Sequence, residues 1–340
     1  MKVRSLCIAA LCCAAAGLLA GRSSHAQTSA TLYGLIGLDV ASTKRSGGPP
    51  AAIAMQSPGL TAPYWGLRIA EDLGGGYRAL AVLESFFQPV NGGIGRTSAD
   101  PYWGRNTYAG IEGPFGTVTL GRQTNLLYLA EQAVNPFRAS ILFSPLVTQT
   151  FVASYGGAIA GDTVWNNAIQ YTSPTVGGLT ASAVYAPGGL AGANGAANAG
   201  LSLRYASGPL TAVAAAQRTR IVAGAAAPTQ HAYLAGLAYA FPRITLYGAI
   251  QGTHTTATDT GSHTFEAGVS VPVTSRLSAL GEWAYTRRTA ARTAVSRNTG
   301  VAGLDYSLSR RTDVYALAGY DRLGGSGTAA TWALGIRHLF

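Results

Sequence analysis

The sequence predicts an all-β fold, a transmembrane β-barrel, from three observations: the last strand, the composition, and a repeated alternation of apolar and polar residues. At the C-terminus, apolar or ring-bearing residues occupy every second position: Trp332, Leu334, Ile336, His338 and Phe340. Successive strand residues point to opposite faces, so this strand has one apolar face and one small or polar face. A barrel wall with lipid outside and water inside requires this pattern.

The composition supports the same fold class. Hydrophobic residues make up 48% of the chain and charged residues only 11%. After residue 26 no apolar run reaches the roughly 20 residues of a membrane-spanning helix. Both facts fit if the apolar residues are spread one in two along many short strands. The 44 Gly and 17 Tyr residues suit crowded barrel walls and membrane–water interfaces.

Period-two alternation recurs along the chain, with charges on the face opposite the apolar one. It is clearest at 31–40, 201–205, 244–251, 264–271 and 301–308. Short turns are expected at 71–76, 207–209 and 309–312, and long loops at 43–58, 186–200 and 253–262. The longest stretch without alternation, about 124–165, is expected to be a loop folded into the barrel lumen.

The N-terminus predicts export by a cleaved signal peptide at 1–26. Lys2 and Arg4 precede an apolar segment at 6–20, and small residues around Ala26 suit signal peptidase. Residues 27–340 would then form the barrel domain. All three cysteines lie in the leader, so the mature chain would have no disulfide and no cysteine metal site.

The charge balance bears on possible partners. Three of the 24 basic residues lie in the leader, which leaves 21 against 14 acidic residues, a net charge of +7. The basic residues are scattered singly among strand-like segments, so nucleic acid is not an expected partner. We expect the excess to line the pore and to give a weak to moderate anion preference. No cofactor or metal is expected.

Seven segments resemble the general porins of β-proteobacterial outer membranes, and they follow the family's order. These are residues 30–34, 65–76, 83–85, 115–123, 170–174, 309–315 and 335–340. The resemblance implies a 16-stranded antiparallel barrel in the outer membrane. It also implies a homotrimer and passive diffusion of small hydrophilic solutes and ions. Trp332, Leu334, Ile336 and Phe340 would then serve as the signal for the outer-membrane insertion machinery, which would read the terminal Phe.

In this family the third outer loop folds inward, and acidic loop residues face basic residues on the wall. The resemblance places that loop at 125–162, with Glu131, Arg138 and Asp162 as constriction candidates. Two acidic residues are few for so long a loop. A second departure is Pro63-Tyr64, where the pattern usually carries an Arg.

Arg68 and Arg122 fall on the family's basic wall positions, and Arg105 is a further candidate. Alternation supports Arg68, because the apolar residues Trp65, Leu67 and Ile69 take the other face. A strict count puts Arg122 on the apolar face, so either a bulge intervenes or Arg122 lies beyond the membrane part of its strand. Other expected lumen residues are Glu84, Arg204, Glu266, Glu282, Asp305 and Arg337.

Two alternatives to a channel stay open: a barrel enzyme, and a β-rich adhesion or structural protein without a pore. An enzyme would need clustered Ser, His and acidic residues. The histidines lie instead in unrelated strand or loop contexts, with no Gly-x-Ser-x-Gly elbow. We therefore expect a non-enzymatic channel.

Overall fold

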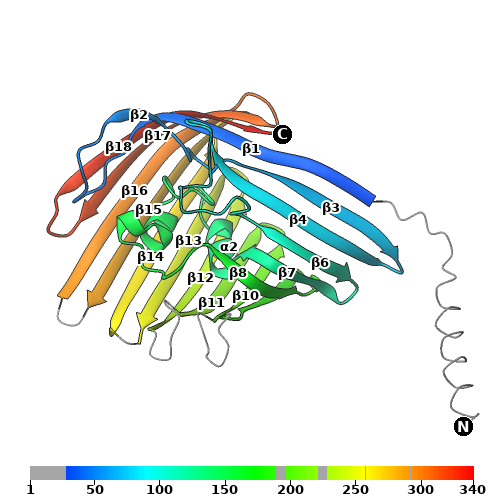
Figure 1. The fold of residues 1–340 in the computed structure, drawn as a ribbon. Coiled ribbons are helices and arrows are strands. Elements are labelled where there is room, and N and C mark those ends of the chain that lie inside the picture. Colours follow the sequence, from blue (N-terminus) through cyan, green and yellow to red (C-terminus); the bar gives the residue numbers. More distant parts are fainter. Residues whose placement is uncertain (1–27, 189–196, 221–227, 257, 291–292) are drawn as a thin grey trace, which may run out of the picture.

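The computed structural model describes residues 28–188, 197–220, 228–256, 258–290 and 293–340, so the expected signal peptide lies outside the described residues. The strands form one antiparallel sheet that curves round and joins its own ends (Figure 1). The strand β1 (Thr28–Ser42) pairs with the last strand, β18 (Thr328–Leu339), and also with β3 (Tyr64–Gly74). The sheet is therefore a closed barrel.

The wall has sixteen strand positions. Two short strands, β2 and β5, add no further position to the wall. Strand β2 pairs with residues 39–42 of β1, beyond the part of β1 that pairs with β3. Strand β5 has only two residues and pairs with the end of β4. The remaining strands are β4 (Tyr77–Gln88), β6 (Thr107–Gly113), β7 (Gly116–Thr124), β8 (Val164–Thr172), β9 (Leu179–Ala186), β10 (Asn198–Ser207), β11 (Leu210–Arg220), β12 (Thr229–Phe241), β13 (Ile244–Thr255), β14 (Thr260–Pro272), β15 (Leu277–Ala290), β16 (Thr293–Ser307) and β17 (Thr312–Leu323), with β2 at Ile53–Gln56 and β5 at Gly93–Ile94. The predicted 16-stranded antiparallel barrel is confirmed.

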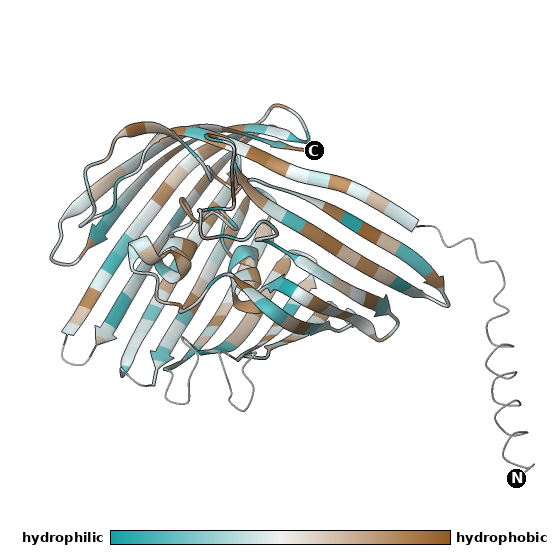
Figure 2. Cartoon of the chain, in the orientation of Figure 1, coloured by the Kyte–Doolittle hydropathy of each residue, from teal (hydrophilic) through white to brown (hydrophobic). Residues whose placement is uncertain are grey.

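The alternation along each strand separates the two faces of the wall, and Figure 2 shows apolar and polar residues following one another along the strands. On β14, Phe265 is 50% exposed and its neighbour Glu266 only 5%. On β15, Trp283 is 45% exposed and Glu282 only 4%. The apolar side chains point outward, where lipid surrounds the barrel, whereas the carboxylates point into the barrel.

Short turns and longer connections alternate between the two ends of the barrel. The turn from β3 to β4 uses Gly74, Gly75 and Gly76 at φ of +78°, +64° and +82°, a backbone region that glycine enters without a steric penalty. The loops that follow β1, β4 and β7 lie at the opposite end, which we call the outer end because long loops of such barrels face outward.

Two of the expected long loops are shorter than predicted. The prediction of a loop at 253–262 is wrong. Strands β13 and β14 stay paired up to Thr255 and Thr260, so only residues 256–259 connect them. The Thr-rich composition suggested a loop, but β-branched Thr fits a paired strand well. The loop expected at 186–200 begins after Ala186 and ends where β10 starts at Asn198.

Two short helices and a 3₁₀ turn lie in the connection from β7 to β8. They are α2 (Leu126–Ala133), α3 (Pro145–Phe151) and η1 (Ala153–Tyr155). The side chains of Asn125 and Ser144 cap α2 and α3, accepting hydrogen bonds from the backbone N–H groups of Tyr128 and Val147. In the described part of the chain, no helix combines the length and the apolarity that a membrane crossing needs.

The lipid-facing wall predicts a position-dependent effect of charge. Ile169 on β8 is 47% exposed on the outer face, and its neighbour Gln170 borders an internal cavity. We expect Ile169→Arg to lower the free energy of unfolding in lipid vesicles by about 2–4 kcal/mol near the bilayer midplane. Gln170→Arg, the matched control, should change it far less. Equal losses in urea titrations would contradict the assignment of the two faces.

Candidate functional site

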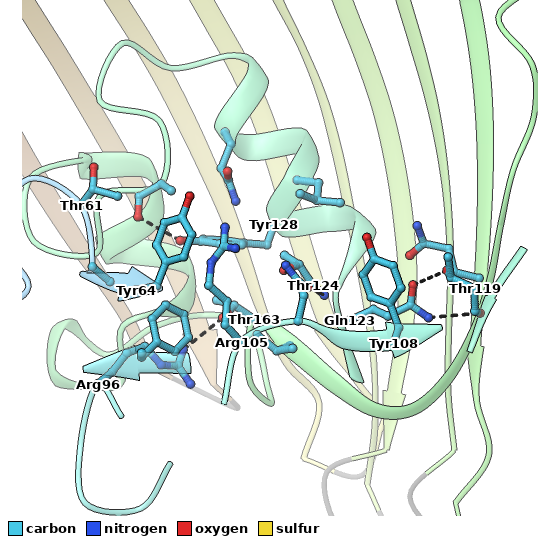
Figure 3. Close-up of a pocket in the computed structure, with 18 of the residues that line it drawn as sticks. Thr61, Tyr64, Arg96, Arg105, Tyr108, Thr119, Gln123, Thr124, Tyr128 and Thr163 are labelled. Atoms are coloured by element: carbon cyan, nitrogen blue, oxygen red, sulfur yellow. Dashed lines mark hydrogen bonds between the residues drawn. The ribbon is translucent and has the colours of Figure 1, made fainter. Parts of the chain in front are cut away.

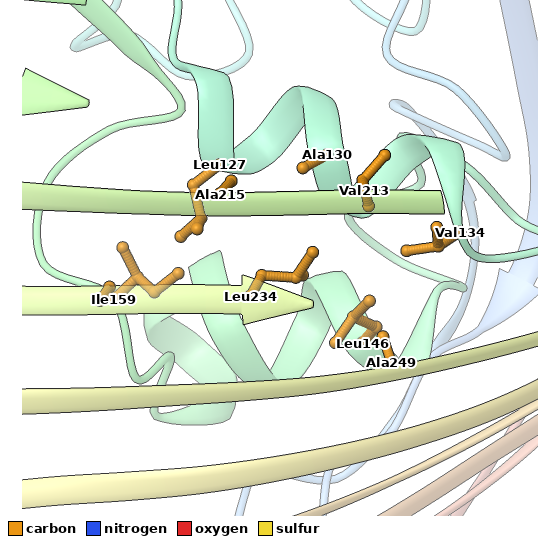
Figure 4. Close-up of a cluster of buried hydrophobic side chains, with 10 residues drawn as sticks. Leu127, Ala130, Val134, Leu146, Ile159, Val213, Ala215, Leu234 and Ala249 are labelled. Carbon is orange, nitrogen blue, oxygen red and sulfur yellow. The ribbon is translucent and has the colours of Figure 1, made fainter. Parts of the chain in front are cut away.

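The connection at 125–163 packs against the inner wall of the barrel. Leu127 and Ala130 of α2, Val134 directly after it and Leu146 of α3 form one apolar cluster with wall residues of β11, β12 and β13 (Figure 4). The wall members are Val213, Ala215, Ala232, Leu234 and Ala249. Their chain neighbours, such as Ala214 and Ala216, are exposed on the other face. The two helices therefore occupy the inner side of this part of the wall.

Polar contacts hold α3 to the wall. The carboxylate Oε1 of Glu282 on β15 accepts hydrogen bonds from Ser144 Oγ at 2.9 Å and from the backbone N–H of Leu146 at 2.8 Å. Gln149 donates from Nε2 to the carbonyl of Ala284 at 2.9 Å and to Thr299 Oγ1 at 2.8 Å. Because these groups are buried, breaking their hydrogen bonds would leave them unsatisfied, which is costly. The contacts fix the connection in one position.

A cavity of about 400 Å³ lies between this connection and the wall formed by β3, β4, β6, β7 and β8. Figure 3 shows Tyr64, Arg105 and Tyr108 along it from the wall side and Tyr128 from α2. Two of its described lining residues, Arg96 and Arg105, are basic, and none is acidic. The remaining polar groups are hydroxyls and amides.

Arg105 and Arg68 extend from the wall in this region. Arg105 forms an ion pair with Glu84 and lies over the ring of Tyr64, 4.0 Å from its centroid. Glu84 is 3% exposed and accepts hydrogen bonds from Tyr33 Oη and Asn106 Nδ2, both at 2.6 Å. The Arg68 side chain is exposed, and its guanidinium lies 5.0 Å from the centroid of the Tyr33 ring. Arg68 thus carries a charge on the inner face without an ion pair in the described part of the chain.

Arg122 belongs to a polar cluster at the outer end of β7. The β7–β8 register is irregular between Gly121 and Gln123, and Arg122 donates to the carbonyl of Gly104 at 2.8 Å and to Asn166 Oδ1 at 2.6 Å. It also donates to Asp162 at 3.2 Å. Both features that could reconcile Arg122 with the strand pattern, a register irregularity and a place near the strand end, are therefore present.

Arg96 joins the same cluster and links two outer loops. It pairs with Asp100 at 2.8 Å in its own loop and with Asp162 at 2.9 Å in the connection that carries α2. Burial raises the pKa of Asp162, but the hydrogen bond from Arg96 and the charges of Arg96 and Arg122 outweigh it and hold that pKa below its usual range. The charge of Asp162 is therefore matched by two guanidinium groups.

The other two loop candidates lie apart. Glu131 is completely buried and accepts a hydrogen bond from Thr150 Oγ1 at 3.0 Å, so its expected position on the water-filled path is wrong. Its carboxylate contacts α3 and is shielded from solvent. Arg138 is exposed, and with Arg204 it borders a second cavity of about 280 Å³.

Several contributing residues were missed from the sequence. Tyr33, Tyr64 and Asn106 hold Glu84 and Arg105, and Arg96 with Asp100 forms the loop cluster. Their strand or loop positions gave no pattern that ties them to partners far along the chain. Of the remaining expected lumen residues, Arg337 pairs with Asp305 at 3.6 Å and with Asp313 at 3.0 Å.

The cluster around Asp162 predicts an acid-sensitive loop. The folded-state pKa values of Asp162 and Asp100 lie below the unfolded value of about 3.9. These carboxylates therefore stabilise the folded loops above that value, and the stabilisation is lost as the pH falls through the folded-state values. We expect current fluctuations to increase below about pH 4, and Asp162→Asn to produce them at neutral pH. Single-channel recordings that stay equally quiet from pH 7 to pH 3 would contradict this role.

The fold and the site together define a class. A closed barrel with an apolar exterior, an inner face bearing charges and an internal connection beside an open passage is a transmembrane channel. The chain belongs to the Gram-negative porin family, whose model matches residues 9–326. It is an outer-membrane porin that allows small hydrophilic solutes and ions to diffuse through a water-filled channel.

Individual relatives agree with this assignment. The chain is 28% identical to outer membrane porin protein 32 of Delftia acidovorans, over 76% of this chain and 75% of that protein. It is 26% identical to an outer membrane porin protein of Bordetella pertussis, over 96% of this chain and 98% of that protein. Its fold is similar to that of an anion-selective porin from Comamonas acidovorans, with a TM-score of 0.79 and 23% identity over 92% of this chain and 100% of that one.

Proposed function

We propose that this channel has a weak to moderate preference for anions. The observation that carries the proposal is a set of exposed arginines toward the inside of the barrel, Arg68, Arg138 and Arg204, which have no ion pair in the described part of the chain. Fixed charges along a narrow water-filled path raise the local concentration of counter-ions. The path would therefore favour chloride over potassium.

The acidic residues of the inner loop do not offset these charges. Glu131 is a fully buried residue of α2, and Asp162 is paired with Arg96 and Arg122. Arg68, Arg138 and Arg204 are exposed side chains that add positive charge to the inner face. The loop thus narrows the passage without supplying the acidic side that the family resemblance implies.

The test is the reversal potential of single channels in a planar bilayer under a potassium chloride gradient. We expect a sign that corresponds to chloride being more permeant than potassium, reduced but not reversed at high salt because screening shortens the range of the fixed charges. A reversal potential of the cation-selective sign would overturn the proposal.

We also propose the assembly that the family resemblance implies: export with cleavage after Ala26, insertion directed by the C-terminal strand, and a homotrimer. Trp332, Leu334 and Ile336 on β18 are exposed, as is Phe340, which follows the strand. Phe340 exchanges two backbone hydrogen bonds of 3.1 Å with Gly34, so this residue helps to close the barrel.

Deletion of Phe340 should lower the amount of folded protein in the outer membrane. Gel mobility before and after heating should report a trimer, and a monomer in mild detergent would contradict it.

A further inference from the structure

We propose that the outer mouth of this porin contains a saturable binding site for small phosphate-type dianions in solution. The site is a cavity of about 550 Å³ lined by the loop after β1, the η1 turn and the outer ends of β15 and β16. It shares no lining residue with the cavity beside Arg105. The proposal goes beyond ion preference, because a preference needs no stoichiometric site.

The cavity has an excess of positive charge. Arg45, Arg288 and Arg297 line it, and none of its described lining residues is acidic. Arg297 is neutralised, because its Nε and Nη2 donate to Asp321 at 2.8 and 2.5 Å. In the described part of the chain, Arg45 and Arg288 have no carboxylate within ion-pair distance. Two unmatched positive charges remain.

The η1 turn holds these groups around one space. Two guanidinium groups lie near the ring of Tyr155, with that of Arg297 4.6 Å and that of Arg45 5.6 Å from the ring centroid. Arg297 also donates to the carbonyl of Tyr155 at 2.8 Å. The next residue, Gly156, has a φ of +71°, and a β-carbon there would lie 3.6 Å from Arg288 Nη1. The turn thus brings its backbone close to the third guanidinium.

Asp321 cannot neutralise the other two arginines as well. Besides Arg297, its carboxylate accepts hydrogen bonds from the backbone N–H of Ser46 at 2.8 Å and from Thr299 Oγ1 at 3.0 Å. Its oxygens are therefore fully engaged on the wall side of the cavity. An anion from solution would be the partner that Arg45 and Arg288 lack.

The chemistry of the lining favours a phosphate-type dianion over chloride. A guanidinium group presents parallel N–H donors that match two oxygens of a phosphate. Ser154 and Ser296 also line the cavity, and their hydroxyls can donate to further oxygens. Arg45 and Arg288 are only partly exposed, and charges interact more strongly where water is partly excluded.

The ligand is a solute and not a lipid headgroup. Arg288 and Arg297 lie on the inner face of the wall, on the same side of their strands as the buried Thr286 and Thr299. Arg287, the neighbour of Arg288, is exposed on the lipid-facing side. The cavity therefore opens to the water of the channel mouth.

The test uses inorganic phosphate as the probe on the folded protein in detergent and in planar bilayers. We expect saturable binding near pH 8 by isothermal titration calorimetry. Phosphate added to the outer side should also lower the chloride current in a saturable way. Arg45→Gln combined with Arg288→Gln should weaken apparent affinity by about tenfold or more. Arg287→Gln, which removes the same charge from the lipid-facing side, should leave it unchanged.

The outcomes separate this proposal from the anion preference. Non-saturable binding by the wild-type protein, or equal affinity in the double variant and the wild type, would overturn the site. Retained heat-modifiable mobility of the double variant will show that it is folded. The reversal potential in potassium chloride alone reports the preference set by Arg68, Arg138 and Arg204, none of which lines this cavity, so either proposal can fail while the other stands.

Discussion

Replacing Arg68 by Glu is expected to lower the chloride-to-potassium permeability ratio by about three- to tenfold. Arg68 is exposed on the inner face and contacts the ring of Tyr33 without an ion pair in the described part of the chain. The substitution therefore changes the charge by two units without leaving a buried partner unsatisfied. Arg105 is a poorer choice, because its loss would leave the buried carboxylate of Glu84 without its cation.

The expected size follows from the distance between an ion and the wall. At about 5 Å in water, two unit charges interact with about 0.8 kcal/mol. A swing of two charge units is then worth about 1.7 kcal/mol before salt screening reduces it. The effect should shrink as the salt concentration rises.

The measurement is the reversal potential at a low and a high potassium chloride concentration. Arg310→Glu is the matched control, since it makes the same charge change in an exposed turn at the end of the barrel opposite the loops. It should shift the reversal potential far less. Equal shifts in the two variants would mean that net charge, and not the wall beside the passage, sets the selectivity.

The fold was predictable because the alternation is local. The faces of Phe265 and Glu266 follow from their positions in one strand, and lipid on one side enforces the same rule on every strand. The loop at 253–262 was mispredicted because composition was weighed above pairing: Thr253 to Thr255 continue β13. Local signals fix the facing of strand residues more reliably than the ends of strands.

The site was only partly predictable, because its charges are set by distant partners. Nothing near Glu131 in the sequence indicates that α2 buries it against the wall, since Thr150 and the apolar cluster come from elsewhere. The role of Arg122 likewise depends on Asn166 in the neighbouring strand β8 and on Asp162 just before that strand. The distribution of the charges over free, paired and buried positions required the three-dimensional structure.

Replacing residues 126–160 by a short Gly/Ser linker is expected to raise the single-channel conductance about twofold or more, since a 16-stranded barrel otherwise encloses an open aqueous channel. The barrel can accept this change because Thr124 and Val164 are already paired across β7 and β8. A short turn can therefore join the two strands without altering the wall. The strands keep their own hydrogen bonds, which do not depend on the helices.

The same replacement should weaken selectivity, because a wider path lets ions stay farther from Arg68 and Arg105 than a Debye length of about 10 Å at 0.1 M salt. It also uncovers Val213 and Leu234 on the inner wall, so the variant should unfold at lower urea concentration. The control inserts the same linker between Gly325 and Ser326 in an outer turn, where conductance should not change. An unchanged conductance after the deletion would contradict this prediction. It would show that the narrowest part of the path does not lie beside α2 and α3.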